Sequence, residues 1–591
     1  MLYNLDLLVV SVPVLDLQYP PSSPAVIKAC AKSAGFRAKT ADYNILLRDI
    51  CGSREKFFSV QYNFENVSTA VHDTDDAVKY FFDNDHDIIQ QWLSACITDI
   101  QKKNPIWLGV SVFSYKSHKA TLLLCDAVKK TLPNIKIVLG GRGASSYALG
   151  PDHLHFVNKL KKYFGKYYSA NFADTLLKYN VVDKVIHGDG EQTIINLLKG
   201  YTEDNINGTV ESIDLEQVPF VDFDDYDITT YDYINEPIIP ITGSKGCVRQ
   251  CTFCDIPVLW PKFKFRSGDH IAQEMIHLQN KHNVNKFYMS DSLVNGSLKA
   301  FNDFIRTLAD YNNTHPDKQV KWVGQYITRP ISNVLNDEYY DLLKASGGEG
   351  LTIGVESGSD SVRKHMKKKF TTQDVDAELE QFDRRRIVCV LLFFSCYPTE
   401  TWQDFLDTVD MFIRYQKYCA SGTVYKLTLG TPYTHHQQTP LWNMQEDIGL
   451  ITEAGSDILW LLKDNPELTF YERIKRRLIL QEVATCLRLP MSRNTAELNQ
   501  LKDSLILHYD SIKEFFGPLP KINLYQDLYN LTPYGNLLMP ADLQLKIKQH
   551  LNNNPDVIEK IISKHANIND DIQFDNQSYS KLKEVLLNGV A

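Results

Sequence analysis

Short apolar runs alternate with helix-forming stretches along most of the chain, and this alternation restricts the fold more than any other feature. In the first two hundred residues, apolar runs predict strands at 5–12, 40–43, 107–113, 135–139 and 184–186. Helical patterns lie between them, as at 24–33 and 119–130, and a further one begins at Glu191. Strands that alternate with helices predict an α/β fold with a doubly wound parallel sheet.

The alternation restarts near Ile238 after an acidic stretch, residues 218–236, which we interpret as a linker. Further strands are predicted at 286–289, 321–327, 350–355, 387–394 and 425–429. About six β/α units fit a partial (β/α)6 barrel, in which the chemistry lies at the carboxyl ends of the strands.

The strand signal fades after Trp442, and patterns at 471–487 and 498–516 predict a helical C-terminal domain. We therefore expect three domains, with boundaries at 1–215, 216–444 and 445–591. A chain of 591 residues is too long for one hydrophobic core, which agrees with this division.

Charge and hydropathy argue against two classes of protein. The formal net charge of -9 gives no support for nucleic-acid binding through the phosphate backbone. The longest apolar run, 387–394, is far shorter than the ~20 residues of a membrane-spanning helix. The start of the chain lacks the basic residues of a signal peptide, so we expect a cytoplasmic protein whose 11 cysteines are reduced or bind metal.

Three of the cysteines lie close together, in the segment Gly246-Cys247-Val-Arg-Gln-Cys251-Thr-Phe-Cys254. Chance produces this C-x3-C-x2-C spacing in about 0.004 of chains with this cysteine content. Three thiolates on one loop can hold three corners of a [4Fe–4S] cluster, because such clusters are ligated by cysteine sulfur. The absence of a fourth cysteine in the motif leaves one iron open to a chelating ligand.

A structural zinc site that uses the same three cysteines and a distant fourth ligand is the competing interpretation. Structural zinc usually has a second paired group of ligands, and the nearest downstream histidine, His270, has no partner at ligand spacing. The remaining cysteines are scattered, and we expect them to be small buried apolar residues: Cys30, Cys51, Cys96, Cys125, Cys389, Cys396, Cys419 and Cys486.

The cysteine spacing, with aromatic Phe253 before the third cysteine, resembles the signature of the radical S-adenosylmethionine (SAM) superfamily. The resemblance covers residues 238–444. Three more segments resemble one subgroup, the B12-binding-domain radical SAM enzymes: Gly354-Val-Glu-Ser-Gly-Ser-Asp360, Tyr397-Pro-Thr-Glu-Thr401 and Thr439-Pro-Leu441. This chain departs from the subgroup at Thr399, which replaces the usual glycine of the turn, and at Ser395-Cys396, where a glycine is common.

Residues 1–215 are similar to the B12-binding domain of that subgroup. Segments that look like those around the cobalamin cavity are Pro20-Pro21, Gly109–Phe113, Leu139–Gly141 and His187–Glu191. The D-x-H-x-x-G pattern, which supplies an axial histidine in other B12 proteins, is absent, and Asp42-Tyr-Asn44 stands near its place. The resemblance implies cobalamin without a histidine on cobalt. A long insertion at 147–180 is a second departure.

The resemblance also implies particular cofactor contacts. Cys247, Cys251 and Cys254 would hold the cluster. The residues expected to contact SAM are Phe253, packed on the adenine, with Asp291, Gln325, Arg329, Glu356 and Ser357. The residues expected around cobalamin are Ser111, Phe113, Ser114, Gly140, Gly141, Gly188, Gly190 and Glu191.

The function implied by the resemblance is reductive cleavage of SAM, with an electron from a flavodoxin- or ferredoxin-like donor, and cobalamin-dependent methylation of an unactivated carbon. The first alternative is an enzyme of the same subgroup that catalyses cyclisation, rearrangement or oxidation without methyl transfer. An alternative from another class is a metal-stabilised binding or regulatory protein. The sequence does not indicate the substrate.

Weaker features have more ordinary interpretations. His435 and His436 follow a predicted strand, and we interpret them as polar loop residues, with a substrate-facing role as the alternative. Three basic runs predict solvated helix faces: 367–369, 384–386 and 473–477.

Overall fold

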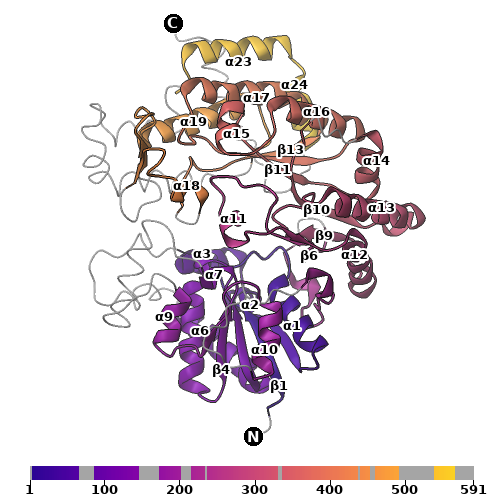
Figure 1. Cartoon of the computed structure of the whole chain (residues 1–591), viewed down its shortest axis with the longest axis vertical. Helices are drawn as coiled ribbons and strands as arrows, with labels where there is room; N and C mark the ends of the chain where they lie inside the picture. The colour runs from indigo at the N-terminus through magenta and orange to yellow at the C-terminus, as the bar shows by residue number, and fades with distance from the viewer. Residues whose placement is uncertain are drawn as a thin grey trace. The chain divides into compact units, whose positions relative to one another are not determined.

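The computed structural model describes residues 3–65, 86–145, 172–200, 214–232, 236–330, 336–436, 439–452, 460–491 and 538–565 (Figure 1). Contacts within the chain define two compact units. The first unit comprises residues 1–242 and 273–288, and the second comprises 243–272 and 289–591. The three-domain boundaries expected from the sequence stay a prediction. In the described ranges, no helix is long and apolar enough to cross a membrane.

The first unit contains a five-stranded parallel sheet with strand order β2-β1-β3-β4-β5. Its strands are β1 (Leu5–Ser11), β2 (Ala38–Asp42), β3 (Pro105–Ser111), β4 (Lys136–Gly140) and β5 (Lys184–Val185). Each lies within a few residues of a predicted strand, so the predicted doubly wound sheet is confirmed. In sheets of this order, ligands bind beyond the carboxyl ends of the strands, where β1 and β3 lead to opposite sides.

Helices cover both faces of this sheet (Figure 1). Alternate residues of β1 explain why: Leu7 and Val9 point into one core, while Leu8 and Val10 point into the other. The first core is covered by α1 (Ser22–Ser33) and α10 (Glu191–Leu198). The second is covered by α2 (Tyr43–Cys51), α3 (Arg54–Glu65), α5 (His86–Lys103), α6 (His118–Thr131), α7 (Arg142–Ser145) and α9 (Phe172–Lys178).

The acidic stretch that we interpreted as a linker packs against the first unit instead. Lys28 of α1 is only 1% exposed, and its Nζ lies 2.9 Å from Asp222 and 2.6 Å from Asp225. Asp225 also accepts a hydrogen bond from the backbone N–H of Thr40 at 2.9 Å. The linker interpretation was wrong because the acidic residues pair with a buried lysine rather than with solvent.

A second sheet has six strands in the order β13-β12-β11-β10-β9-β6. These are β6 (Ile238–Ile241), β9 (Lys286–Met289), β10 (Lys321–Tyr326), β11 (Leu351–Glu356), β12 (Cys389–Phe393) and β13 (Val424–Leu429). Strands β10 to β13 pair in parallel. The strands are separated in sequence by α12 (Gly268–His282), α13 (Leu298–Thr314), α14 (Asp337–Ala345), α15 (Asp360–His365), α16 (Thr372–Arg385) and α17 (Trp402–Ser421). The predicted partial (β/α)6 barrel is confirmed.

The C-terminal part is mainly helical, as predicted, and it adds a β-hairpin that the sequence did not indicate. Its elements are α18 (Pro440–Asn443), β14 (Leu450–Thr452), β15 (Trp460–Leu462), α19 (Phe470–Cys486), α23 (Ala541–Asn553) and α24 (Val557–His565). After α19 the chain returns to the barrel, where the carbonyl of Pro490 accepts the N–H of Leu427 at 2.8 Å. The helix predicted at 498–516 lies outside the described residues.

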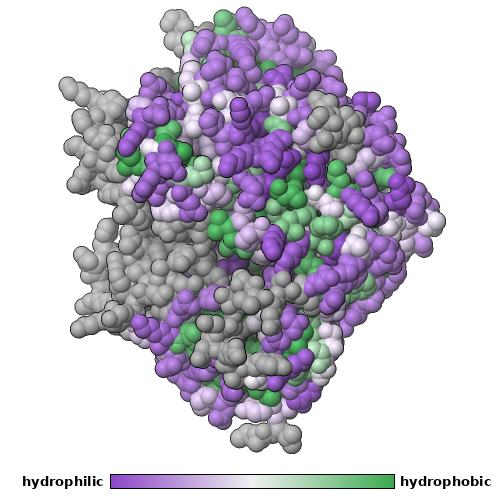
Figure 2. All heavy atoms as spheres, in the orientation of Figure 1, coloured by the Kyte–Doolittle hydropathy of each residue, from purple (hydrophilic) through white to green (hydrophobic). Residues whose placement is uncertain are grey.

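The basic run in α19 does not form a solvated helix face. The face of the molecule in Figure 2 is mostly hydrophilic, yet Arg473, Arg476 and Arg477 are each at most 3% exposed. Arg477 Nε donates to the carbonyl of Gly430 at 2.8 Å, and Arg476 Nη1 lies 3.3 Å from Glu400 Oε1. The prediction was wrong because Arg477 donates to carbonyls at the end of β13 and Arg476 pairs with a buried carboxylate, which a local sequence pattern cannot reveal.

Candidate active site

The cysteine loop is closed at its base by a short antiparallel pair of strands, β7 (Ser244–Lys245) and β8 (Lys264–Phe265). Gly246, directly before the first cysteine, has a φ of +83°, and a Cβ there would lie 3.0 Å from the carbonyl oxygen of Lys262. Glycine adopts this backbone conformation without steric cost. The glycine therefore lets the chain turn out of β7 into the loop.

Thr252 fixes the middle of this loop and is only 2% exposed. Its N–H donates to the carbonyl of Met366 at 3.2 Å, and its carbonyl accepts the N–H of Leu441 at 2.8 Å. Its hydroxyl lies 2.9 Å from the Tyr397 hydroxyl. Two of the segments that resemble the subgroup, at Tyr397 and Leu441, thus hold the cysteine loop in place.

The three thiols of the loop are partly or fully removed from solvent. Cys251 is buried, and Cys247 and Cys254 are half-buried. Burial raises the pKa of each thiol, and that of Cys254 to about 12. Binding to a metal lowers the pKa of a thiol, because a coordinating thiol is deprotonated outright. The backbone N–H of Arg249 already donates to the sulfur of Cys247 at 3.4 Å.

Positive charges surround the loop. The charges of Lys368, Arg249 and Arg329 oppose the effect of burial on the pKa of Cys247, and Lys368 does the same at Cys251. In the described part of the chain, no three His, Cys, Asp or Glu side chains converge as around a single metal ion. A [4Fe–4S] cluster binds its thiolates at separate iron corners. Three thiols among cations therefore fit such a cluster.

Lys368 belongs to this site, although its basic run predicted a solvated helix face. Its side chain is buried, with Nζ 2.8 Å from Glu356 Oε1 and 5.6 Å from the centre of the Phe253 ring. Burial lowers the pKa of Lys368, but the negative charges of Glu356 and Cys251 outweigh it and raise the pKa overall. A Cβ on Gly354 would lie 3.0 Å from Nζ, so this glycine leaves room for the ion pair.

The Glu356 backbone is held in an uncommon conformation at the end of β11. Its φ is +69°, and the register with β12 shifts between Gly354 and Glu356. A bulge of this kind re-aims a side chain at the rim of a barrel. Strained non-glycine residues also cluster at functional sites. Both features support a functional role for this carboxylate.

Asp291 braces the base of the cysteine loop. It is only 3% exposed, and its Oδ2 accepts the N–H of Gly243 at 2.9 Å. Burial raises the pKa of Asp291 to about 6. The SAM contact expected of this residue stays a prediction.

Gln325 and Arg329 lie on and after β10. Gln325 pairs in register with Thr352, on the half-buried face of β11 that also carries Glu356. Arg329 Nη2 donates to the carbonyls of Asn295 and, at 2.9 Å, Gly296. The arginine thus joins the segment after β10 to the loop that follows β9.

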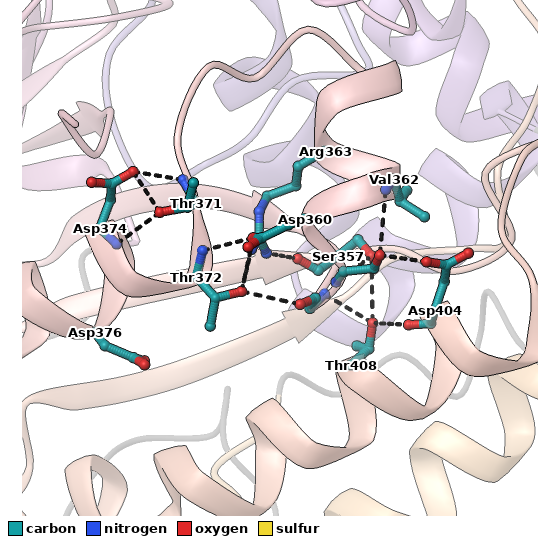
Figure 3. A network of polar contacts seen from close by, with 12 residues as sticks. Ser357, Asp360, Val362, Arg363, Thr371, Thr372, Asp374, Asp376, Asp404 and Thr408 are labelled. Carbon is teal, nitrogen blue, oxygen red and sulfur yellow. Dashed lines mark hydrogen bonds and ion pairs between the residues drawn. The ribbon is translucent and has the colours of Figure 1, made fainter. Parts of the chain in front are cut away.

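Ser357 is buried in a polar network after β11 (Figure 3). Its hydroxyl accepts the N–H of Ser359 at 3.2 Å and lies 3.5 Å from the Thr408 hydroxyl. Its carbonyl accepts a hydrogen bond from Arg363, and Ser359 Oγ donates to Asp404 at 2.5 Å. The hydroxyl of Ser357 therefore stabilises its own loop, and its expected SAM contact stays a prediction.

In the first unit, backbone hydrogen bonds join the loops after β3 and β4. The N–H of Val112 donates to the carbonyl of Gly140, and the N–H of Gly143 donates to that of Val112, both at 2.8 Å. Gly141 has a φ of +100°, and a Cβ there would lie 2.6 Å from the Val112 carbonyl oxygen. Next to this tight junction, the Phe113 side chain is 63% exposed. An exposed aromatic ring beside a rigid backbone platform suits a large planar ligand.

The remaining residues expected at cobalamin lie at the carboxyl ends of the same sheet. Ser111 ends β3 and Ser114 follows it, whereas Gly188 has a φ of +81° after β5. Gly190 precedes α10, and Glu191, its first residue, is 7% exposed. Their contacts with cobalamin stay a prediction.

Asp42, which stands near the place of the axial histidine of other B12 proteins, and His187 both form polar contacts within the first unit. Asp42 accepts hydrogen bonds from Ser11 Oγ, Tyr231 Oη and the Asn44 N–H, each at 3.0 Å. Burial raises the pKa of Asp42. His187 Nε2 lies 3.0 Å from Asp174.

His435 lies in a loop, as predicted, but its side chain is fully buried, with Nδ1 3.1 Å from the Tyr433 hydroxyl and its ring stacked on Trp442. Cys396 has a φ of +65°, the conformation that the glycine common at this place in the subgroup would adopt readily.

Of the eight scattered cysteines, seven are buried, as expected, and Cys51 is half-buried.

Comparison with known proteins identifies one domain of the chain. Residues 241–412 match the radical SAM superfamily. The chain contains a radical SAM domain. The [4Fe–4S] cluster and SAM are cofactors of this superfamily, so the recognition made from the cysteine spacing is confirmed.

Two solved structures share the fold over most of this chain. The cobalamin-dependent SAM radical enzyme OxsB matches with a TM-score of 0.54 and 14% identity, over 99% of this chain and 80% of that one. The radical SAM methyltransferase TsrM from Kitasatospora setae, with cobalamin and a [4Fe–4S] cluster bound, matches with a TM-score of 0.51 and 14% identity. The match covers 78% of this chain and 83% of that one. The chain has the fold of B12-binding-domain radical SAM enzymes.

Curated relatives match shorter parts of the chain. The anaerobic magnesium-protoporphyrin IX monomethyl ester cyclase of Synechocystis is 22% identical over 276 residues, which is 44% of this chain and 54% of the relative. Cytidylyl-2-hydroxyethylphosphonate methyltransferase of Streptomyces wedmorensis is 24% identical over 184 residues, which is 29% of this chain and 32% of the relative. The chain spans about half the length of the cyclase, and these relatives differ in the reaction that their names describe.

Proposed function

We propose that the chain is a cobalamin-dependent radical SAM methyltransferase that acts on an unactivated carbon. SAM binding is supported by the buried Glu356–Lys368 ion pair beside the cysteine loop. SAM would chelate the open iron through its amino and carboxylate groups. Glu356 can accept a hydrogen bond from such an amino group, and Lys368 can donate one to such a carboxylate. The cobalamin part is supported by the strand order of the first unit and by exposed Phe113.

When bound, the cluster would supply the electron for reductive cleavage of SAM, and cobalamin would carry the methyl group for transfer to the substrate. The protein holds and orients these groups. Phe253 would pack against the adenine, and Glu356 and Lys368 would hold the amino-acid part of SAM. Gln325, on the same sheet face as Glu356, would contact the ribose. A flavodoxin- or ferredoxin-like protein would deliver the electron.

Replacing Lys368 with methionine is expected to weaken SAM binding about tenfold, because one charge-assisted hydrogen bond contributes ~1.5 kcal/mol or more. Lys364→Met is the matched control, since Lys364 lies on the exposed side of α15. Equilibrium binding of SAM to the anaerobically reconstituted proteins measures both. Equal SAM affinity in Lys368→Met and wild type would exclude the ion pair from the SAM site.

Cobalamin is expected to bind the first unit without a histidine on cobalt. Protein purified after growth with cobalamin should contain about one cobalt per chain, in a base-off form that His187→Ala leaves unchanged. Phe113→Asp should reduce the retained cobalt severalfold, because it places a charge where an apolar contact is expected. If cobalt is absent after growth and after reconstitution with hydroxocobalamin, the methyltransferase proposal fails and the radical SAM domain stands.

A second candidate is a radical SAM cyclase, rearrangement enzyme or oxidase, which the match to the cyclase of Synechocystis favours. The two candidates differ in how SAM is consumed. Methyl transfer through cobalamin converts one SAM to S-adenosylhomocysteine, whereas the second candidate produces 5′-deoxyadenosine alone. A metal-stabilised binding protein would produce neither compound from SAM under reducing conditions.

A further inference from the structure

Two arginines beside the cysteine loop carry buried donors that no described protein atom accepts. These are Nε and Nη2 of Arg249 and Nε of Arg329. Arg249 lies between the first two cysteines of the loop, and Arg329 follows β10. A guanidinium stays charged in proteins, and burial without acceptors is costly. The donors therefore indicate an anionic acceptor other than the protein itself.

The charges of the two arginines converge on the cysteines. The backbone N–H of Arg249 donates to the Cys247 sulfur at 3.4 Å, which places this residue at the first thiol of the loop. The positive charges of Arg249 and Arg329 both act on Cys247. An anionic group on the three thiols would accept hydrogen bonds from the buried donors of both arginines.

We infer that Arg249 and Arg329 donate to the sulfur atoms of the cluster and set its reduction potential. This inference rests on the proposed function, because it requires a cluster on Cys247, Cys251 and Cys254. The potentials of cysteine-ligated clusters depend on net charge and on hydrogen bonds to sulfur. Reduction adds one negative charge to the cluster, so two neighbouring cations favour the reduced state. Arg329 then acts on the cluster rather than on SAM.

The experiment is a redox titration of the reconstituted full-length protein without SAM, followed by electron paramagnetic resonance of the reduced cluster. The variants are Arg249→Gln and Arg329→Gln, each of which keeps a hydrogen-bond donor and removes the charge. Arg384→Gln is the control, because Arg384 is exposed on α16. Each of the two test variants should lower the reduced-to-oxidised ratio at a fixed potential about tenfold, which is ~59 mV for a one-electron couple. The control should match wild type.

The outcomes separate this inference from the proposed function. If wild type assembles no cluster, the proposed function fails. If the clusters of both test variants titrate as wild type does, the inference fails, and it also fails if those variants weaken only the binding of SAM. Should Arg249→Gln hold no iron, Arg329→Gln decides the question, because Arg329 lies outside the cysteine loop. Arg329→Lys, which restores the charge, should recover most of the shift.

Discussion

Replacing any one of Cys247, Cys251 or Cys254 with alanine is expected to abolish SAM cleavage and to leave the chain folded. Each thiolate would hold one iron corner, and the protein offers no fourth cysteine in the motif to replace a lost one. The wild-type protein, reconstituted anaerobically, should carry about four irons per chain with broad absorbance near ~400 nm. Iron analysis and 5′-deoxyadenosine production measure the loss.

Cys51→Ala is the matched control for these variants. Cys51 is the last residue of α2 in the first unit and is half-buried, as Cys247 and Cys254 are. Its replacement should change neither iron content nor SAM cleavage. Undiminished 5′-deoxyadenosine production by any of the three loop variants would refute the cluster assignment.

Asp404→Ala is expected to lower the free energy of unfolding by about 3 kcal/mol, because a buried carboxylate loses several hydrogen bonds and leaves their donors unsatisfied. Asp404 accepts the N–H and the hydroxyl of Thr401 at 2.9 and 2.6 Å in the capping box of α17, and it accepts Ser359 Oγ. Burial raises the pKa of Asp404, but the bonds from Ser359 and Thr401 outweigh it and lower the pKa overall. This stabilisation is therefore present at neutral pH and is lost as pH falls below about 4.

Asp374→Ala is the matched control, because Asp374 makes the same capping box with Thr371 at the start of α16 (Figure 3). It lacks the bond to Ser359. Its loss should cost about 1 kcal/mol, as is typical of a helix cap. Only Asp404→Ala should also weaken SAM binding, since Ser359 belongs to the loop after Glu356. Equal losses of stability and of SAM affinity in both variants would contradict this role of the Ser359–Asp404 bond.

The periodic features of the sequence were sufficient to predict the fold. Parallel strands buried on both faces give continuous apolar runs, and the runs at 5–12 and 387–394 correspond to β1 and β12. The hairpin of β14 and β15 was missed because its two short strands carry too little periodicity to distinguish them from loop.

The cysteine ligands could be predicted because three ligands on one short loop leave a spacing in the sequence. The buried ion pairs of Lys368 and Arg476 could not be predicted, because tertiary contacts bring their partners, Glu356 and Glu400, to them. A basic run looks alike in sequence whether its groups meet water or a buried carboxylate. The left-handed conformation of Glu356 gave no local signal either, since only glycine and asparagine mark such positions reliably.

Incubation of the anaerobically reconstituted wild-type protein with SAM, with and without a strong reductant, tests whether the chain cleaves SAM reductively. We expect reductant-dependent formation of methionine and 5′-deoxyadenosine, measured by chromatography. A folded protein that carries about four irons per chain and releases no 5′-deoxyadenosine under reducing conditions would contradict it.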